Sequence, residues 1–144
     1  MLSKLKIILE DIKIQHTVFA LPFAFMSAFI ASHGIPPPDK LLWLLFAMVG
    51  ARSSAMSFNR IVDRDYDRKN PRTRERALPK GRIKKTHYIL FLLIAASLFI
   101  FSCLMLNRLA LILSPLALII VFFYYYTKMF KIFSHFLMGL CLRM

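Results

Sequence analysis

Three side chains that carry oxygen ligands recur at four-residue spacing in the middle of the chain: Asn59, Asp63 and Asp67. Positions four apart share one face of a helix, so a helix through this segment would carry them as a single stripe. Two carboxylates and an amide suit a hard cation such as Mg²⁺, which proteins commonly hold through one or two carboxylates together with substrate phosphates. Asp65 would point nearly opposite to Asp63, so we assign it no role.

Basic residues surround this acidic stripe. Five of them follow it closely: Arg68, Arg72, Arg74, Arg76 and Lys80. Guanidinium and ammonium groups would suit a diphosphate. Arg52 falls on the same stripe seven residues before Asn59, and a charge at that depth should face the bundle interior because a lipid-facing charge is costly. The spacing leaves two interpretations equally open: a metal-bridged phosphate site, or a helix end stabilised by its own charge pairs.

The elements that position these residues are membrane helices. Hydrophobic residues make up 58% of the chain and the charges fall in blocks, which a soluble domain could not accommodate. Crossing a hydrocarbon core takes roughly 20 helical residues. By this criterion we expect an all-α, polytopic transmembrane helical bundle, with four full spans plus a partial fifth, in a single incomplete domain covering 1–144. The spans are about 17–35, 41–58, 88–107 and 109–127, with the partial one at 132–142 and a polar loop at 59–87.

The distribution of Lys and Arg predicts the orientation of these spans. Basic residues crowd the N-terminus and the loop 59–87, whereas the opposite side carries only Lys40 and Arg108. Loops rich in Lys and Arg stay in the cytoplasm, so we expect a multi-pass protein of the inner (cytoplasmic) membrane with a cytoplasmic N-terminus. Topology and anionic lipid head groups account for the net charge of +13, and we expect no nucleic-acid partner.

The motifs resemble those of the UbiA-type membrane prenyltransferases. The resemblance rests on Asn59-x3-Asp63-x3-Asp67, Asn70-Pro71-Arg72-Thr73 and Arg76-Ala77-Leu78-Pro79-Lys80-Gly81, in the family's order and spacing. The segments from His16 to Phe23 and from Tyr126 to Lys128 also look like family segments. Within the family, the chain is most similar to the 4-hydroxybenzoate polyprenyltransferases of quinone biosynthesis (ubiquinone or menaquinone).

This resemblance implies an activity and a role for each site residue. The reaction would transfer a polyprenyl group from an allylic polyprenyl diphosphate to an aromatic acid such as 4-hydroxybenzoate, with Mg²⁺ as cofactor. The catalytic residues Asn59, Asp63 and Asp67 would bind magnesium and diphosphate. Among the substrate-binding residues, Arg72, Arg76 and Lys128 would hold phosphate oxygens. Arg52 would receive the acceptor's carboxylate, and Tyr124 would border the reacting centre.

The chain also departs from the family. Members carry a second aspartate-rich motif in a later loop of a nine-helix fold, whereas no Asp or Glu follows Glu75 here. The chain therefore resembles the first half of a member, from a truncated, frameshifted or split product, and we expect it to be inactive without a C-terminal half as partner. Two alternatives stay open. One is a non-catalytic membrane remnant that binds diphosphate lipids or anionic head groups. The other is half of a transporter, which is disfavoured because the aspartates lie at the membrane edge and not at the midplane.

Overall fold

The described part of the chain is entirely helical. The computed structural model describes residues 2–13 and 15–127, and these contain five helices and no strand. The helices are α1 (Leu2–Asp11), α2 (Gln15–Ala31), α3 (Pro38–Lys69), α4 (Lys85–Leu106) and α5 (Arg108–Thr127). Three of them, α3, α4 and α5, are long and apolar enough to cross a membrane. The predicted helical bundle is therefore confirmed in its class.

The first of the expected spans is shorter in the structure. The structure has α2 as a helix of 17 residues, about 25 Å long at 1.5 Å per residue, and its apolar part runs only from Thr17 to Ala31. It is shorter than the 17–35 span that we expected. The partial span at 132–142 lies outside the described residues. The count of four full spans and a partial fifth therefore stays a prediction.

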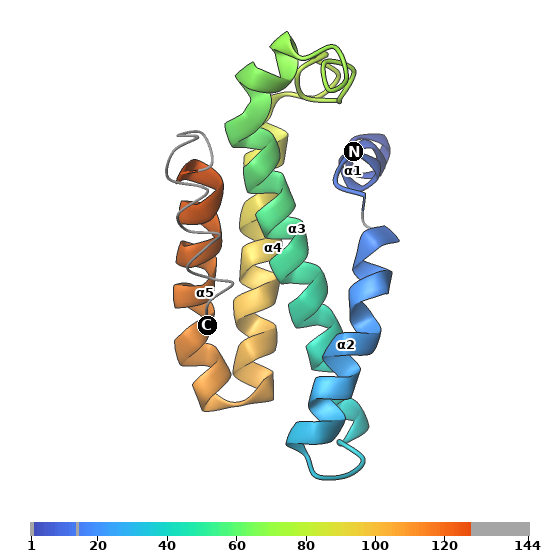
Figure 1. Ribbon diagram of the computed structural model, residues 1–144, viewed down its shortest axis with the longest axis vertical. Helices are drawn as coiled ribbons and strands as arrows, with labels where there is room; N and C mark the ends of the chain where they lie inside the picture. Colours follow the sequence, from blue (N-terminus) through green and yellow to red (C-terminus); the bar gives the residue numbers. More distant parts are fainter. Residues whose placement is uncertain (1, 14, 128–144) are drawn as a thin grey trace.

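Helix α3 organises the bundle. It packs most extensively against α4, and it also contacts α2 and α5 (Figure 1). Its 32 residues continue well beyond the apolar part that we expected to end at 58, so the segment with the acidic stripe is helical and not part of a loop. The prediction that Asn59, Asp63 and Asp67 share one face required a continuous helix through 59–67, and α3 provides it.

Close packing of α3 on α4 depends on Gly50, which is buried between the two helices. A Cβ atom placed on this residue would lie 2.8 Å from the Phe99 backbone nitrogen and 2.9 Å from the Ala95 carbonyl oxygen. Small residues let two membrane helices approach to backbone contact, which increases their van der Waals attraction. Gly50 thus sets the distance between the two helices.

The two ends of the bundle differ in charge. Helix α1 and the basic loop between α3 and α4 lie at one end, and the α2–α3 and α4–α5 turns lie at the other (Figure 1).

At the end with these two turns, Lys40 Nζ donates hydrogen bonds of 2.7 Å to the carbonyls of Met105 and Leu106. The lysine thereby satisfies carbonyls at the C-terminus of α4, where a cation is also favoured by the helix dipole. Asn107 Oδ1 accepts a 2.6 Å hydrogen bond from the Ala110 N–H, so it caps α5 and makes the sharp α4–α5 turn.

The N-terminal helix α1 lies across the basic end of the bundle and is seen nearly end-on in Figure 1. Ile8 on its buried face and Ile12, which directly follows the helix, form a small apolar cluster with Leu78, Ile83 and Tyr88. A polar network also joins α1 to the bundle, because Asp11 contacts one residue of α3 and one of α4.

Asp11, Arg60 and Tyr88 form this network. Arg60 Nε lies 3.3 Å from Asp11 Oδ2, and Arg60 Nη2 donates a 2.9 Å hydrogen bond to the Asp11 carbonyl oxygen. The Tyr88 hydroxyl donates to Asp11 Oδ2 at 2.6 Å. Both side chains of the ion pair are more than nine-tenths buried, so removing a partner would leave an uncompensated polar group away from water. The network therefore fixes α1 to the end of α3 that bears the acidic stripe.

The Tyr88→Phe substitution tests how firmly α1 is held. Losing the hydroxyl leaves Asp11 with one donor fewer, at a cost of about 1–1.5 kcal/mol, so amide hydrogen exchange in α1 should become about fivefold to tenfold faster. Tyr66→Phe is the matched control because Tyr66 is 57% exposed on α3. Equal exchange rates in the two variants would contradict the role of the network.

Candidate functional site

The structure puts the acidic stripe on the last turns of α3. Asn59 and Asp63 are half-buried and Asp67 is buried, with 7% of its surface exposed. Arg76 Nη1 donates to both carboxylate oxygens of Asp67, at 2.8 and 2.7 Å. Two of the residues assigned to this site from the sequence, Asp67 and Arg76, are therefore in direct contact.

The loop that follows α3 folds back on the same helix end. The Thr73 hydroxyl donates to the Asp67 carbonyl oxygen at 3.2 Å, and the Arg72 N–H donates to Asn70 Oδ1 at 3.0 Å, in an Asx-type turn. The turn ends at Gly81, whose φ of 76° lies in the left-handed region that favours glycine. The loop thus returns the chain to α4 while holding Arg76 against the stripe.

The remaining cations of the loop are exposed or paired with Glu75. Arg72 is exposed, and the Lys80 ammonium donates a hydrogen bond to the Glu75 carboxylate. This hydrogen bond and the charge of Lys80 lower the pKa of Glu75, with a smaller contribution from Arg74. Glu75 therefore remains ionised at neutral pH and offsets part of the loop's positive charge.

Two polar atoms on the stripe are buried without a hydrogen-bond partner among the described residues: Asn59 Oδ1 and Arg52 Nε. A buried acceptor or donor left unsatisfied costs about 1–3 kcal/mol, so such atoms need a ligand, water or partner to offset the cost. Asn59 Oδ1 could accept from, or coordinate, a positively charged group. Arg52 Nε could donate to an anion.

Helix α5 brings aromatic side chains to the same face of α3. Phe122 stacks on Phe58 with ring centroids 4.5 Å apart and planes inclined at 21°. Tyr125, three residues later, interacts electrostatically with Arg52 and Asp63. Tyr124, the residue that we expected at the reacting centre, is half-buried and makes an edge-to-face contact with Tyr125 at 5.6 Å.

These contacts add two residues that the sequence did not single out, Tyr125 and Arg60. Tyr125 belongs to a run of three tyrosines, and nothing in that run distinguishes the one that faces α3. Arg60 follows Asn59 directly, but its partner Asp11 lies 49 residues earlier in the sequence. Lys128, to which we gave a phosphate-binding role, lies outside the described residues.

The donor set on α3 fits a magnesium ion in its chemistry, although not as an all-protein cage. Among residues 2–13 and 15–127, no three His, Cys, Asp or Glu side chains converge in a group that could hold a metal. The stripe offers two carboxylates and an amide oxygen, one of which, Asn59 Oδ1, is buried and unsatisfied. Mg²⁺ usually keeps several waters and takes further ligands from substrate phosphates, so this small set is compatible with it.

Comparison with known proteins identifies the family. The model of the UbiA prenyltransferase family matches residues 20–144, which is most of the chain and includes the whole site. This chain belongs to that family.

Several known proteins are similar to this chain in sequence or structure. A protoheme IX farnesyltransferase from Picosynechococcus sp. is 44% identical over 72 residues, covering 50% of this chain and 23% of the relative. A 4-hydroxybenzoate octaprenyltransferase from Blochmanniella pennsylvanica is 35% identical over 106 residues, covering 72% of this chain and 36% of the relative. The apo structure of a UbiA homologue from Aeropyrum pernix K1 superposes with a TM-score of 0.74 at 36% identity, covering 80% of this chain and 42% of that one.

The chain spans less than half the length of these relatives. Family membership and the apolar helices make it a multi-pass membrane protein. The resemblance read from the three motifs is thus confirmed at the level of the family.

Proposed function

We propose that this chain contributes the magnesium- and diphosphate-binding half of a prenyltransferase that attaches a polyprenyl chain to an aromatic acid. The observation that carries the proposal is the stripe of Asn59, Asp63 and Asp67 on α3, with Arg76 bound to Asp67 and an unsatisfied oxygen on Asn59. The carboxylates of the stripe can bind a metal ion and the neighbouring guanidinium groups can bind phosphate oxygens. The two kinds of group together suit a metal-bridged diphosphate better than acidic or basic groups alone would.

In the proposed reaction, the bond between the allylic carbon and the diphosphate oxygen breaks, and the diphosphate leaves with the electron pair. A ring carbon beside the acceptor's hydroxyl bonds to the allylic carbon, and the ring then loses a proton. Bound Mg²⁺ would neutralise the diphosphate and make it a better leaving group. Asn59, Asp63 and Asp67 would hold it there, while Arg72, Arg76 and Lys128 would bind phosphate oxygens.

The acceptor in this proposal is an aromatic acid because of Arg52. Its buried Nε has no hydrogen-bond partner among the described residues, and a guanidinium can bind a carboxylate through two parallel hydrogen bonds. Tyr124 would border the reacting centre. We add Tyr125 to this list because it is the tyrosine that interacts with both Arg52 and Asp63. 4-Hydroxybenzoate is our first choice of acceptor, and the similarity to protoheme IX farnesyltransferases makes protoheme IX the second.

We also propose that the reaction needs acidic ligands from outside this chain. No Asp or Glu follows Glu75, so one side of the diphosphate would lack metal ligands. The N-terminus and the loop after α3 are placed on the cytoplasmic side of the inner membrane in this proposal, since both are rich in Lys and Arg.

Prenyl transfer in isolated membranes tests the proposed function. Labelled 4-hydroxybenzoate or protoheme IX, a polyprenyl diphosphate and Mg²⁺ would be given to membranes with this chain, and to membranes with a version extended through the coding sequence downstream. We expect Mg²⁺-dependent prenylation of 4-hydroxybenzoate by the extended form alone. Activity from the 144 residues alone would refute the need for outside ligands, and no activity from either form would favour a non-catalytic remnant.

Arg52→Ala tests the assignment of the acceptor. Loss of a charge-assisted contact should raise the KM for the aromatic acid in the active form about tenfold or more, with little change in the KM for the polyprenyl diphosphate. The control is Arg64→Ala, which removes the same charge from an exposed position of α3. Equal increases in both KM values would count against a carboxylate-binding role.

A further inference from the structure

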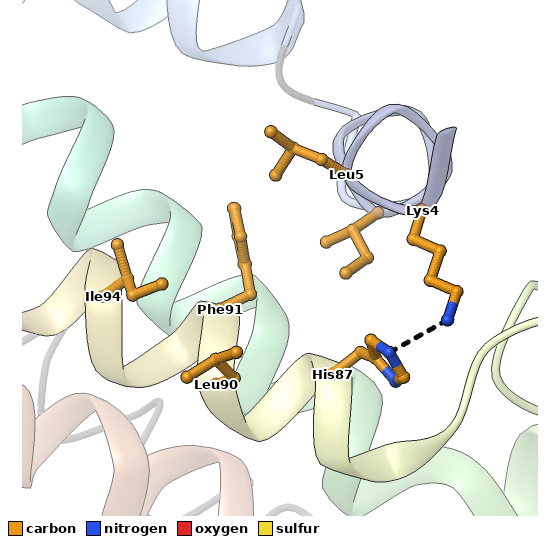
Figure 2. A pocket seen from close by; sticks show the side chains of 7 residues that line it. Lys4, Leu5, His87, Leu90, Phe91 and Ile94 are labelled. Atoms are coloured by element: carbon orange, nitrogen blue, oxygen red, sulfur yellow. Dashed lines mark hydrogen bonds between the residues drawn. The ribbon is translucent and has the colours of Figure 1, made fainter. Parts of the chain in front are cut away.

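A cavity of about 720 Å³ separates the N-terminal helix from the start of α4, away from the acidic stripe. Helix α1 contributes Lys4, Leu5 and Ile8 to its wall. Helix α4 contributes His87, Leu90, Phe91 and Ile94. Figure 2 shows the side chains of both helices projecting into the space between them. The position of α1 is set independently of this cavity, by the network of Asp11, Arg60 and Tyr88.

The polar part of the wall is basic. Lys4 Nζ lies 3.2 Å from His87 Nε2 and donates a hydrogen bond to it (Figure 2), and none of the described residues that line the cavity is acidic. Lys84 is the N-cap residue of α4 and Lys85 is its first residue, and the helix start has no side-chain cap. Uncapped N–H groups and the positive end of the helix dipole favour an anion at this position.

The remainder of the wall is apolar and runs into the membrane-spanning part of α4. Leu90, Phe91 and Ile94 follow His87 along the helix, and Ile94 is about 10 Å deeper than His87 at 1.5 Å per residue. Leu90 and Ile94 are 51% and 60% exposed, although they lie next to α1. The cavity therefore has the Lys4 ammonium at the basic end of the bundle and an apolar wall that extends toward the bilayer centre.

We propose that this cavity binds an anionic phospholipid of the bilayer. Its phosphate would lie against Lys4, His87 and the start of α4, and one acyl chain would cover Leu90, Phe91 and Ile94. Charge complementarity selects an anionic head group over a zwitterionic one, and the apolar wall selects a lipid over a free phosphate. The bound lipid would join α1 to α4 and hold both at the membrane surface. The inference is independent of the proposed prenyl transfer, because no residue of the acidic stripe lines the cavity.

Native mass spectrometry of the purified chain tests this site. The probes are phosphatidylglycerol and phosphatidylcholine with identical acyl chains, and the measured quantity is the affinity of each for the detergent-solubilised protein. We expect phosphatidylglycerol to bind more tightly. Lys4→Gln should weaken its binding about fivefold, since one lysine near a head group contributes that much. Glycerol phosphate, a head group without chains, should not displace the lipid.

Two matched controls separate this site from general attraction to acidic lipids. Lys6→Gln removes the same charge from the same helix, but Lys6 is exposed, pairs with Glu10 at 4.0 Å and does not line the cavity. It should leave phosphatidylglycerol binding nearly unchanged. Leu90→Trp should fill the cavity and weaken binding, whereas Leu93→Trp, at an exposed position of α4 outside the cavity, should not.

Three results would overturn the proposal. They are equal affinity for the two lipids, equal effects of Lys4→Gln and Lys6→Gln, and displacement of the lipid by glycerol phosphate. The first would mean that the cavity accepts another occupant, such as a protein segment. The second would mean that only the overall charge matters, and the third that the site recognises phosphate alone.

Discussion

Asp63→Asn and Asp67→Asn should each lower the turnover of the active, extended enzyme on the order of 100-fold, with membrane insertion unchanged. Each substitution removes one negative charge and one strong cation ligand from the stripe on α3, while keeping the size of the side chain. An amide at position 67 can still accept a hydrogen bond from Arg76, so the loop after α3 should keep its place. Prenyl transfer measured over a range of Mg²⁺ concentrations checks this, because loss of a metal ligand should raise the Mg²⁺ concentration needed for half-maximal activity.

Asp65→Asn is the matched control for this pair. Asp65 lies on the same turns of α3 but is exposed, and helical geometry places it nearly opposite Asp63. The substitution changes the net charge by the same amount and should leave both turnover and Mg²⁺ dependence within about twofold, as for surface substitutions generally. Normal turnover in Asp63→Asn and Asp67→Asn would refute the metal assignment. Equal losses in all three variants would indicate that only the overall charge matters.

Gly50→Val should cause the largest loss of stability, about 3 kcal/mol in the free energy of unfolding, and Gly50→Ala should cost about 1–2 kcal/mol. Two effects compete in Gly50→Ala. Alanine has the higher helix propensity by about 1 kcal/mol, which would stabilise α3. The new Cβ would, however, lie 2.8 and 2.9 Å from backbone atoms of α4, which cannot move aside as a flexible side chain could. The helices must therefore separate, and the packing cost exceeds the gain in propensity.

Gly34→Ala is the control because a Cβ at Gly34 meets no atom within 4 Å. Reversible unfolding in mixed micelles, followed by circular dichroism, gives the free energies to compare. Gly34→Ala should leave the stability unchanged within about 0.5 kcal/mol, as expected for a surface position. A Gly50→Ala variant as stable as the original chain would mean that α3 and α4 adjust their spacing at no cost, contrary to the role assigned to Gly50.

The two experiments are linked through the length of α3. The part of this helix that packs on α4 through Gly50 is continuous with the part that carries Asn59, Asp63 and Asp67. A shift between α3 and α4 would therefore move the stripe relative to Arg76, because Arg76 lies in the loop that joins the two helices. Measuring prenyl transfer in Gly50→Ala would show how closely the site depends on this packing.

The sequence by itself determined the class of fold and the residues of the stripe. An apolar run long enough to cross a bilayer predicts a helix whatever packs against it, because a membrane helix satisfies its backbone hydrogen bonds internally. The four-residue spacing of Asn59, Asp63 and Asp67 is local in the same sense, because 3.6 residues per turn places them on one face of any helix. The family motifs are likewise contiguous segments, and the family assignment they suggested is confirmed.

Only the tertiary structure decided which side chains meet. The contact between Asp67 and Arg76 depends on how the loop folds back, and the pairing of Arg60 with Asp11 joins residues 49 positions apart. The rotation of α5 about its axis determines that Tyr125 interacts with both Arg52 and Asp63. The close approach at Gly50 likewise requires α4. These features depend on the relative placement of whole helices, which arises from the sum of many weak packing contacts and leaves no short pattern in the sequence.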